Sequence, residues 1–481
     1  MKRHRWVAAA AALWSGLCVA DPIDDYVRAT LARERIPGLV LGIATGIEGQ
    51  RVRSYSAVRT YGLANLEHQV AVRPNTIFQS GSVGKQFTAA AILLQVEDGR
   101  LDLDDPIAQY FPSDRPHWRS IRIRHLLTHT SGLPDYYDEK GSPTLDLRRD
   151  YTEEELLQMA MRLEPQFAPG ERWAYSNTGY VVLGALIRKV TGKFYGEVLR
   201  ERLFRPAVME TARVISEADI VPNRAAGYEL VGSEVRNQSW VSPSLNTTAD
   251  GALYLTARDL LSWDVALRER RILDKSSYDL MWRPVRLNDG THYPYGFGWF
   301  VGEQRGSTSI EHGGSWQGFR AHIARYVDRG LSIVVMCNLA ACDAGDIAHQ
   351  VAGLVDPLLR LPDPQVLGRD EQPQRTLVLR ELLAAWTEGR THAGMSTGFA
   401  AHMDPSARTA AERREVAGHL KQETVFRYLA EDDVRQAEIA RSGAKVYRIV
   451  YCATVTAHGT QAYRFYLDEA GKVADIVVEG W

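Results

Sequence analysis

Residues 78–94 read FQSGSVGKQFTAAAILL, and the rest of the sequence is best interpreted from this stretch. Its length and alanine content predict a mostly buried helix rather than a strand. Ser82 and Lys85 are three residues apart, so one helix face carries both side chains and the amine can lie beside the hydroxyl. Burial disfavours the charged lysine, lowers its pKa and lets it accept the serine proton. The pair therefore predicts a nucleophile and its base, although Ser-x-x-Lys alone also occurs by chance as an exposed serine and a solvated lysine.

Two competing motifs do not fit this stretch. A phosphate loop requires a serine or threonine directly after its lysine, and Gln86 stands there instead. The nucleophile elbow G-x-S-x-G requires a glycine where the chain has Ser80.

A second candidate element is the segment Tyr175-Ser-Asn, which precedes a predicted helix at 180–189. A tyrosine hydroxyl near an ammonium can be held partly as phenolate and serve as a general base, which makes Tyr175 a catalytic candidate. Asn177 offers donors and an acceptor to a substrate amide. The alternative is a loop tyrosine followed by an asparagine that caps the helix.

A third element, Glu311-His-Gly-Gly-Ser-Trp, is expected between two strands. Gly313 and Gly314 would let a substrate backbone lie along a strand edge. The backbone N–H groups of Ser315 and Ser82 form the expected oxyanion hole. The alternative is a glycine-rich turn with a surface histidine.

His312 bears on substrate charge. Histidine has a reference pKa of about 6.5, so His312 is expected to be often neutral near pH 7 and to protonate as the pH falls from about 8 to about 5.5. Glu311 should point to the other face of the strand. A neutral imidazole attracts a substrate carboxylate only weakly.

Composition describes an ordinary globular protein. The chain has 481 residues, of which 45% are hydrophobic and 24% are charged, and its net charge is −2. We expect two or three folding units, and no basic field that would hold nucleic acid. No cysteine–histidine spacing is typical of a zinc site. Cys337 and Cys342 either pair with each other in an oxidising compartment or remain free thiols.

The first 20 residues are typical of a signal peptide, because a basic start precedes a short apolar run and then polar residues from Asp21. We therefore expect a periplasmic or secreted protein with no stable membrane span after cleavage. An uncleaved anchor is the alternative. A lipoprotein is disfavoured because Leu17 precedes Cys18, where lipid attachment requires a small residue.

The sequence divides into three predicted segments: a signal peptide (1–20), a hydrolase domain (21–362) and an accessory domain (366–481). In the hydrolase domain, strands at 39–45, 54–62, 295–302, 319–327 and 331–336 enclose helices, which predicts an α/β sheet with a helical insertion. The accessory domain is expected to be α+β. Its helices are predicted at 377–386 and 407–441, and a β-meander at 445–457, 461–467 and 473–479.

Together the three elements resemble the Ser-x-x-Lys, Tyr-x-Asn and His/Lys-x-Gly motifs of the penicillin-recognising serine hydrolases. That superfamily includes class C β-lactamases, D-alanyl-D-alanine carboxypeptidases, D-aminopeptidases and β-lactamase-like esterases. Segments starting at Phe78, His125, Phe167 and Thr256 are similar to it too, and the resemblance covers about residues 23–358.

The resemblance implies an antiparallel sheet flanked by helices, an all-α subdomain, and a site in the cleft between them, with no metal or cofactor. By position, Ser82 attacks a carbonyl, Lys85 and Tyr175 relay the proton, and Asn177 and His312 position the substrate. Cephalosporin-hydrolysing members usually carry lysine where this chain has His312, which counts against β-lactam substrates. Class A enzymes have a Ser-Asp-Asn second motif, so the tyrosine-based route is expected here.

The expected function is an exported serine hydrolase that forms an acyl-enzyme on Ser82. Its substrate would be a small molecule or peptide: a D-amino-acid peptide, a peptidoglycan fragment or a small ester. A class C-like β-lactamase is an alternative within the same chemistry. Alternatives of another class are a penicillin- or peptidoglycan-binding sensor that acylates without turnover, and a scaffold whose function resides in residues 366–481.

Overall fold

The computed structural model describes residues 21–46, 55–136, 145–214, 218–243, 245, 248–251, 253–362, 370–401, 407–434, 440–442, 444–456 and 459–480. The predicted signal peptide therefore lies outside the described residues. Among the helices described, none is both long and apolar enough to span a membrane.

A seven-stranded antiparallel sheet forms the centre of the larger unit, in the order β10-β11-β12-β13-β1-β2-β3. Strands from both ends of this unit meet at the pairing of β1 with β13, where Leu39 lies opposite Cys337. The strands are β1 (Gly38–Thr45), β2 (Tyr55–Asn65), β3 (Val70–Ala71), β10 (Phe300–Gln304), β11 (Ser307–Trp316), β12 (Phe319–Tyr326) and β13 (Leu331–Cys337). The predicted sheet, with strands from both ends of this unit, is confirmed.

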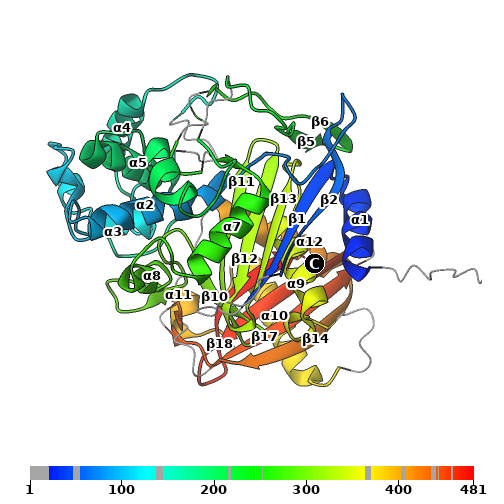
Figure 1. Cartoon of the computed structure of the whole chain (residues 1–481). Helices are drawn as coiled ribbons and strands as arrows, with labels where there is room; N and C mark the ends of the chain where they lie inside the picture. Colours follow the sequence, from blue (N-terminus) through cyan, green and yellow to red (C-terminus); the bar gives the residue numbers. More distant parts are fainter. Residues whose placement is uncertain are drawn as a thin grey trace, which may run out of the picture.

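Helices cover both faces of this sheet (Figure 1). α7 packs on one face and α9 on the other, with α1 beside α9. The helices are α1 (Pro22–Glu34), α2 (Lys85–Glu97), α3 (Ile123–Leu127), α4 (Glu153–Arg162), α5 (Asn177–Thr191), α6 (Tyr195–Leu199), α7 (Ala257–Arg268), α8 (Lys275–Met281), α9 (Ala344–Val355), α10 (Pro373–Thr387), α11 (Thr397–Ala401) and α12 (Ala407–Gln422).

Short strand pairs lie outside the seven-stranded sheet, three of them in the larger unit and the last in the C-terminal part of the chain. They are β4 (Phe78–Gln79) with β7 (Tyr254–Leu255), β5 (Tyr228–Val231) with β6 (Glu234–Asn237), β8 (Val285–Arg286) with β9 (His292–Tyr293), and β15 (Ala440–Arg441) with β16 (Ala444–Lys445).

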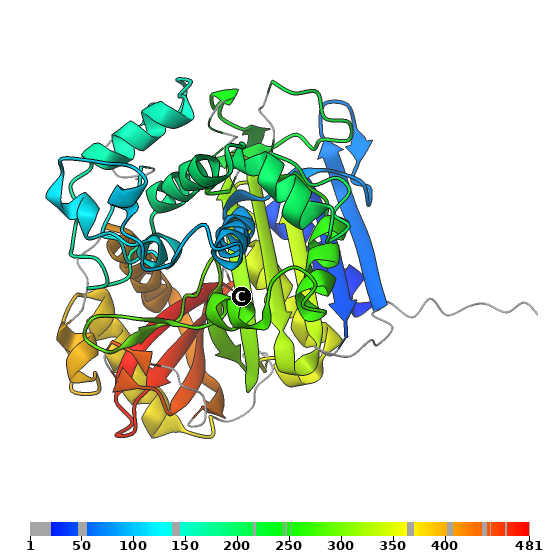
Figure 2. The same cartoon turned by 60° about the vertical axis from the view of Figure 1, so that its left-hand side comes forward.

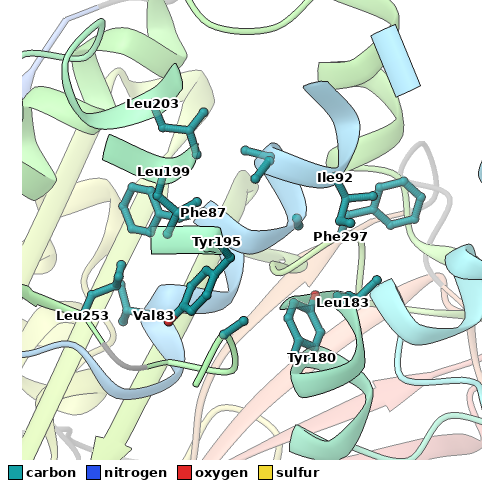
Figure 3. Close-up of a cluster of buried hydrophobic side chains, with 14 of the residues drawn as sticks. Val83, Phe87, Ile92, Tyr180, Leu183, Tyr195, Leu199, Leu203, Leu253 and Phe297 are labelled. Atoms are coloured by element: carbon teal, nitrogen blue, oxygen red, sulfur yellow. The ribbon is translucent and has the colours of Figure 1, made fainter. Parts of the chain in front are cut away.

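Helix α2 is the buried centre of the helical region, as its sequence predicts. Its residues from Lys85 to Gln95 are all buried. Figure 3 shows Phe87 and Ile92 of α2 among side chains of α5 and α6, including Leu183 and Leu199. Removing that much apolar surface from water stabilises the helix strongly, at about 25 cal/mol per Å². Lys85 is part of this buried helix and is itself inaccessible to solvent.

The C-terminal unit is a four-stranded antiparallel sheet, β14-β17-β18-β19, with helices α10 to α12. Its strands are β14 (Glu423–Asp433), β17 (Arg448–Thr456), β18 (Gly459–Leu467) and β19 (Val473–Gly480). Figures 1 and 2 show this sheet, in orange and red, beside the β10 side of the larger sheet. Arg305, in the β10–β11 turn, bonds to Asp432 of β14 at 2.7 Å.

Three sequence expectations need correction. The helix expected at 407–441 ends at Gln422, because the segment after it pairs with β17 as strand β14. The strand expected at 295–302 begins only at Phe300. Residues 311–316 were expected between strands but lie within β11. Cys337 and Cys342, for which two states were open, form a disulfide.

Candidate active site

Ser82 lies in a tight turn, η1 (Gly81–Gly84), that leads directly into α2. Gly81 adopts a positive φ of 49°. A Cβ there would lie 2.5 Å from the backbone nitrogen of Ser315, so only glycine lets β11 approach the turn this closely. The turn thus brings the Ser82 region against β11.

Lys85 is fully buried and its amine has three partners. Lys85 Nζ lies 3.0 Å from Ser82 Oγ, 2.6 Å from Asn177 Oδ1 and 2.5 Å from the Asp250 carbonyl oxygen. A neutral amine has two N–H groups and one lone pair. The amide and carbonyl oxygens accept the two N–H groups, so the lone pair is left for the Ser82 hydroxyl. The geometry suits a base that removes the Ser82 proton.

Burial lowers the pKa of the Lys85 ammonium to about 8, against the opposing charges of Asp250 and Asp135. A lysine with this pKa is partly neutral near pH 7, whereas an ordinary lysine with a pKa near 10.4 is not. The expected pKa-lowering by burial is therefore present.

Tyr175 lies against Lys85, whose Nζ is 4.8 Å from the centre of the tyrosine ring. The Tyr175 phenol oxygen is buried and makes no hydrogen bond of normal geometry within the described residues. The nearby Ser82 side chain acts to lower the pKa of Tyr175. Burial nevertheless raises the pKa of Tyr175 well above 10. The expected phenolate is wrong for the resting site. Tyr175 is a neutral phenol, which can donate a proton but is not the initial base.

Asn177 is the first residue of α5, after Ser176, whose hydroxyl caps the helix by accepting from the Gly179 N–H. The side-chain amide oxygen of Asn177 accepts a hydrogen bond from Lys85, and the amide nitrogen of Asn177 donates one to Asp135 Oδ2 at 3.0 Å. Asn177 was expected to contact substrate. In the free protein its amide instead holds the base in place, with its second N–H as the remaining donor.

His312 belongs to a chain of hydrogen bonds that fixes its tautomer. The Ser176 backbone N–H can only donate, and it donates to His129 Nδ1 at 3.1 Å. His129 Nε2–H therefore donates to Tyr295 Oη at 3.2 Å. The Tyr295 hydroxyl then donates to His312 Nε2 at 3.0 Å.

This series of hydrogen bonds ends at His312 Nδ1–H, which donates to the Gly313 carbonyl oxygen at 2.6 Å. Both ring nitrogens of His312 are therefore occupied by protein partners. Burial and the nearby Lys85 lower the pKa of His312 to about 3. This pKa agrees with the expected neutral imidazole near pH 7 and disagrees with the expected protonation between about pH 8 and 5.5. The hydrogen bonds of His312 link the motifs, and its role in positioning substrate stays a prediction.

The part of β11 after Glu311 has a partner strand on one side only. β10 pairs with residues 307–311 and ends there, while β12 continues beside residues 309–316. The Ser82 turn packs against β11 and β12, and a Cβ on Gly314 would be 1.9 Å from the Ser80 carbonyl oxygen. A Cβ on Gly313 would meet only the His322 ring, at 3.4 Å. The oxyanion hole expected from Ser82 and Ser315 stays a prediction, which this close approach supports.

Sequence reasoning missed several residues of the site. Asp250 and Asp135 supply the charges around Lys85, Tyr136 bonds to Asp250 Oδ2 at 2.6 Å, and Tyr295 joins His129 to His312. His129 lies within the stretch from His125 that resembles the family, and Asp135 directly follows that stretch. This resemblance is the only feature of the sequence that could have indicated them. Nothing in the sequence marks Asp250, whose backbone oxygen is what Lys85 contacts.

Among the residues described, the histidines and carboxylates that could hold a metal are Glu311, His322 and His349, which gather away from Ser82. They lie on the face of the sheet that α9 covers. The chemistry at Ser82 is derived below from side chains alone.

The fold and the geometry around Ser82 are those of a serine hydrolase. The profile of the family described as Beta-lactamase matches residues 23–354, which is more than half of the chain. The chain belongs to the beta-lactamase family, and the predicted resemblance is confirmed.

Two curated relatives illustrate this membership. Penicillin-binding protein 4* of Bacillus subtilis (strain 168) is 31% identical over 297 residues, covering 58% of this chain and 64% of its own length. A D-aminopeptidase of Gluconobacter oxydans (strain 621H) is 28% identical over 409 residues, covering 84% of this chain and 70% of its own length. The alignments thus span about two thirds of these relatives.

Solved structures agree on the fold. A D-stereospecific amidohydrolase from Streptomyces sp. superposes with a TM-score of 0.58 at 26% identity, over 70% of this chain and 98% of its own. A D-amino acid amidase from Ochrobactrum anthropi SV3 gives 0.58 at 27%, over 70% and 95%. An octameric penicillin-binding protein homologue from Pyrococcus abyssi gives 0.61 at 22% over 95% of this chain and 99% of its own, which extends the shared fold to nearly the full length.

Proposed function

We propose that this protein is an exported hydrolase that forms an acyl-enzyme on Ser82 and cleaves amides or short peptides beginning with a D-amino acid. The observation that carries the proposal is the contact of 3.0 Å between Ser82 Oγ and the fully buried amine of Lys85. Three of the relatives and neighbours described above support it by their names, since one is a D-aminopeptidase, one a D-stereospecific amidohydrolase and one a D-amino acid amidase.

The proposed reaction uses the contacts of Lys85 and the position of Tyr175 beside it. Neutral Lys85 takes the hydroxyl proton while Ser82 Oγ bonds to the substrate carbonyl carbon, and the carbonyl oxygen becomes an oxyanion held by backbone N–H groups. The neutral phenol of Tyr175 gives its proton to the leaving nitrogen as the C–N bond breaks. Lys85, now an ammonium, restores that proton to Tyr175. Water then cleaves the ester by the same groups in reverse.

Two carboxylates define the charge of the site. Asp250 and Asp135 both act on Lys85 electrostatically, and the Asp135 side chain is only half-buried beside Asn177. A free amino terminus is cationic near pH 7, so it is attracted to such a site, whereas a carboxylate next to the scissile bond is repelled. This favours amino-terminal amides over carboxylate-bearing β-lactams.

The test compares a D-amino acid amide with its L-form and with its N-acetylated form. We expect hydrolysis of the D-amide. The kcat/KM of the N-acetyl compound should be lower by about tenfold or more, because acetylation removes one partly screened ion contact. Asp135→Asn should raise KM for the free D-amide by a larger factor than for the N-acetyl compound, while its effect on Lys85 changes the hydrolysis of both alike. Asp114→Asn, at an exposed position, is the control. Equal hydrolysis of free and acetylated amides would contradict the role of Asp135.

Penicillin acylation is a second candidate, favoured by the 31% identity to a penicillin-binding protein. A sensor would show one burst of product equal to the enzyme concentration and then stop. Steady hydrolysis of nitrocefin would instead indicate a β-lactamase. On our proposal nitrocefin turns over slowly and the D-amide turns over continuously.

Export is proposed from the N-terminal sequence, and the Cys337–Cys342 disulfide supports it, because disulfides persist in oxidising compartments. The full chain should be found in the periplasmic or extracellular fraction of a bacterial host. N-terminal sequencing should begin at Asp21. Recovery in the cytoplasm with Met1 retained would contradict export.

A further inference from the structure

Three side chains that the hydrolase mechanism does not use converge on the sheet face opposite Ser82. They are Glu311 of β11, His322 of β12 and His349 of α9. Glu311 Oε2 lies 3.2 Å from His322 Nε2 and 2.8 Å from His349 Nε2, and all three atoms lie within 4.8 Å of one another. We propose that Glu311, His322 and His349 form a binding site for a zinc ion that ties β11, β12 and α9 together.

The donor set matches zinc chemistry. Two imidazoles and one carboxylate are a known protein ligand set for Zn²⁺, with a fourth position left for water. Bonds of about 2.0–2.2 Å to a tetrahedral ion place neighbouring ligand atoms roughly 3.4 Å apart. The two contacts made by Glu311 are a few tenths of an ångström shorter than that. Small side-chain rotations therefore suffice to admit the ion.

The backbone holds these ligands in place without the metal. Glu311 pairs with Ala324, and His322 pairs with Gly313, so Glu311 and His322 are diagonal neighbours on one face of two paired strands. α9 packs on β12 and β13 and brings His349 over that face. Sites on paired strands and a packed helix keep their geometry better than sites on loops.

The space around the cluster suits a hydrated ion. A Cβ on Gly345 would come within 3.3 Å of His322 Nδ1, so the glycine leaves this imidazole room to turn. His349 also lines a small cavity with Asp346, Gln304 and Gln350, which reaches Tyr451 and Arg464 of the C-terminal unit. Water from this polar cavity can take the fourth position.

The charges favour a cation. Glu311 Oε2 is the acceptor that faces both imidazoles, so a carboxylate stands at the centre of the cluster. Burial and Asp343 raise the pKa of Asp346 to about 7, and a nearby cation would favour its ionised form. Zinc would bind the two imidazoles through unprotonated Nε2 atoms, the ring nitrogens that already face Glu311.

The site has a consequence for the hydrolase site. Glu311 precedes His312 in β11, and alternate residues of a strand point to opposite faces. An ion fixed at Glu311 would therefore steady the β11 segment that faces the Ser82 turn. The expected effect of zinc is a higher melting temperature with little change in the chemistry at Ser82.

The experiment uses the full chain without a polyhistidine tag, stripped with EDTA and dialysed. Titration with Zn²⁺ alone, followed by calorimetry and elemental analysis, should give one ion per chain and raise Tm. Co²⁺ should bind in its place and produce visible absorption bands of the intensity typical of four-coordinate cobalt. His349→Ala should weaken zinc binding about 100-fold or more, since even outer partners of metal ligands are worth 10–100-fold.

Glu311→Gln is the second variant, because glutamine can still accept a hydrogen bond from an imidazole but is a poor zinc ligand. His68→Ala, at an exposed position, is the control and should bind zinc as the unaltered chain does. Ser82→Ala should also bind normally, which separates this site from the proposed hydrolase function. No zinc binding by the unaltered chain, or equal binding by the His349→Ala and Glu311→Gln variants, would overturn the proposal.

Discussion

Asn177 Oδ1 accepts a hydrogen bond from Lys85 Nζ at 2.6 Å, and this contact joins the Ser-x-x-Lys motif to the Tyr-x-Asn motif. It fixes one amine hydrogen, while the Asp250 carbonyl fixes another. The free lone pair is thereby directed at Ser82. Asn177 thus acts on catalysis through the base as well as through any contact with substrate.

The first prediction concerns pH. Because burial lowers the pKa of Lys85 to about 8, the neutral base is scarce in acid and predominates only above that value. We expect kcat/KM for a neutral ester to rise about tenfold per pH unit up to about pH 8 and then level off. Asp250→Asn removes a charge that raises this pKa, so the rising limb should move to lower pH. An unmoved limb would mean that another group titrates.

The second prediction concerns the proton relay. Lys85→Ala and Tyr175→Phe should each slow acylation by on the order of 10²-fold or more, the usual scale of positioned acid–base groups. Since both residues act on one proton, the double variant should lose far less than the product of the single losses. Pre-steady-state burst rates measure this. Losses that multiply would show two independent pathways.

The third prediction concerns His312. Its pKa of about 3 keeps it neutral across the working range. The ratio of kcat/KM for a carboxylate substrate to that for its neutral ester should therefore be flat between about pH 5.5 and 8. Tyr295→Phe should lower kcat by breaking the link to His129 while leaving the ratio flat. A ratio that rises in acid would mean that His312 protonates and does bind the carboxylate.

The fourth prediction concerns the close approach of β11 to the Ser82 turn. Gly314→Ala places a Cβ 1.9 Å from the Ser80 carbonyl oxygen, so the strand must move and carry Ser315 N–H with it. We expect kcat to fall by about 10²-fold, as when an oxyanion donor is lost. Gly302→Ala, whose Cβ would meet Ser309 Oγ at an ordinary 3.5 Å, is the matched control. Full activity in Gly314→Ala would contradict this geometry.

Periodicity in the sequence predicted the sheet and the buried helix α2, and the three-residue spacing predicted the pair of Ser82 and Lys85. The grouping of this pair with Tyr175 and Asn177 came from the family resemblance. The sequence did not predict the link from His129 through Tyr295 to His312, since only tertiary packing brings these rings together. Nor did it predict the pKa of Tyr175, because desolvation depends on what surrounds a group rather than on its neighbours in sequence. β14 was missed because its charged ends read as a continuation of α12.

The most direct test of the account is mass spectrometry after exposure to a fluorophosphonate, followed by peptide mapping. We expect one adduct per chain, on the peptide that contains Ser82, with its rate of formation following the ionisation of Lys85 near pH 8. Ser82→Ala should fold, melt at a similar temperature and take up no label. Labelling of another serine, or activity in the alanine variant, would contradict the assignment of Ser82 as the nucleophile.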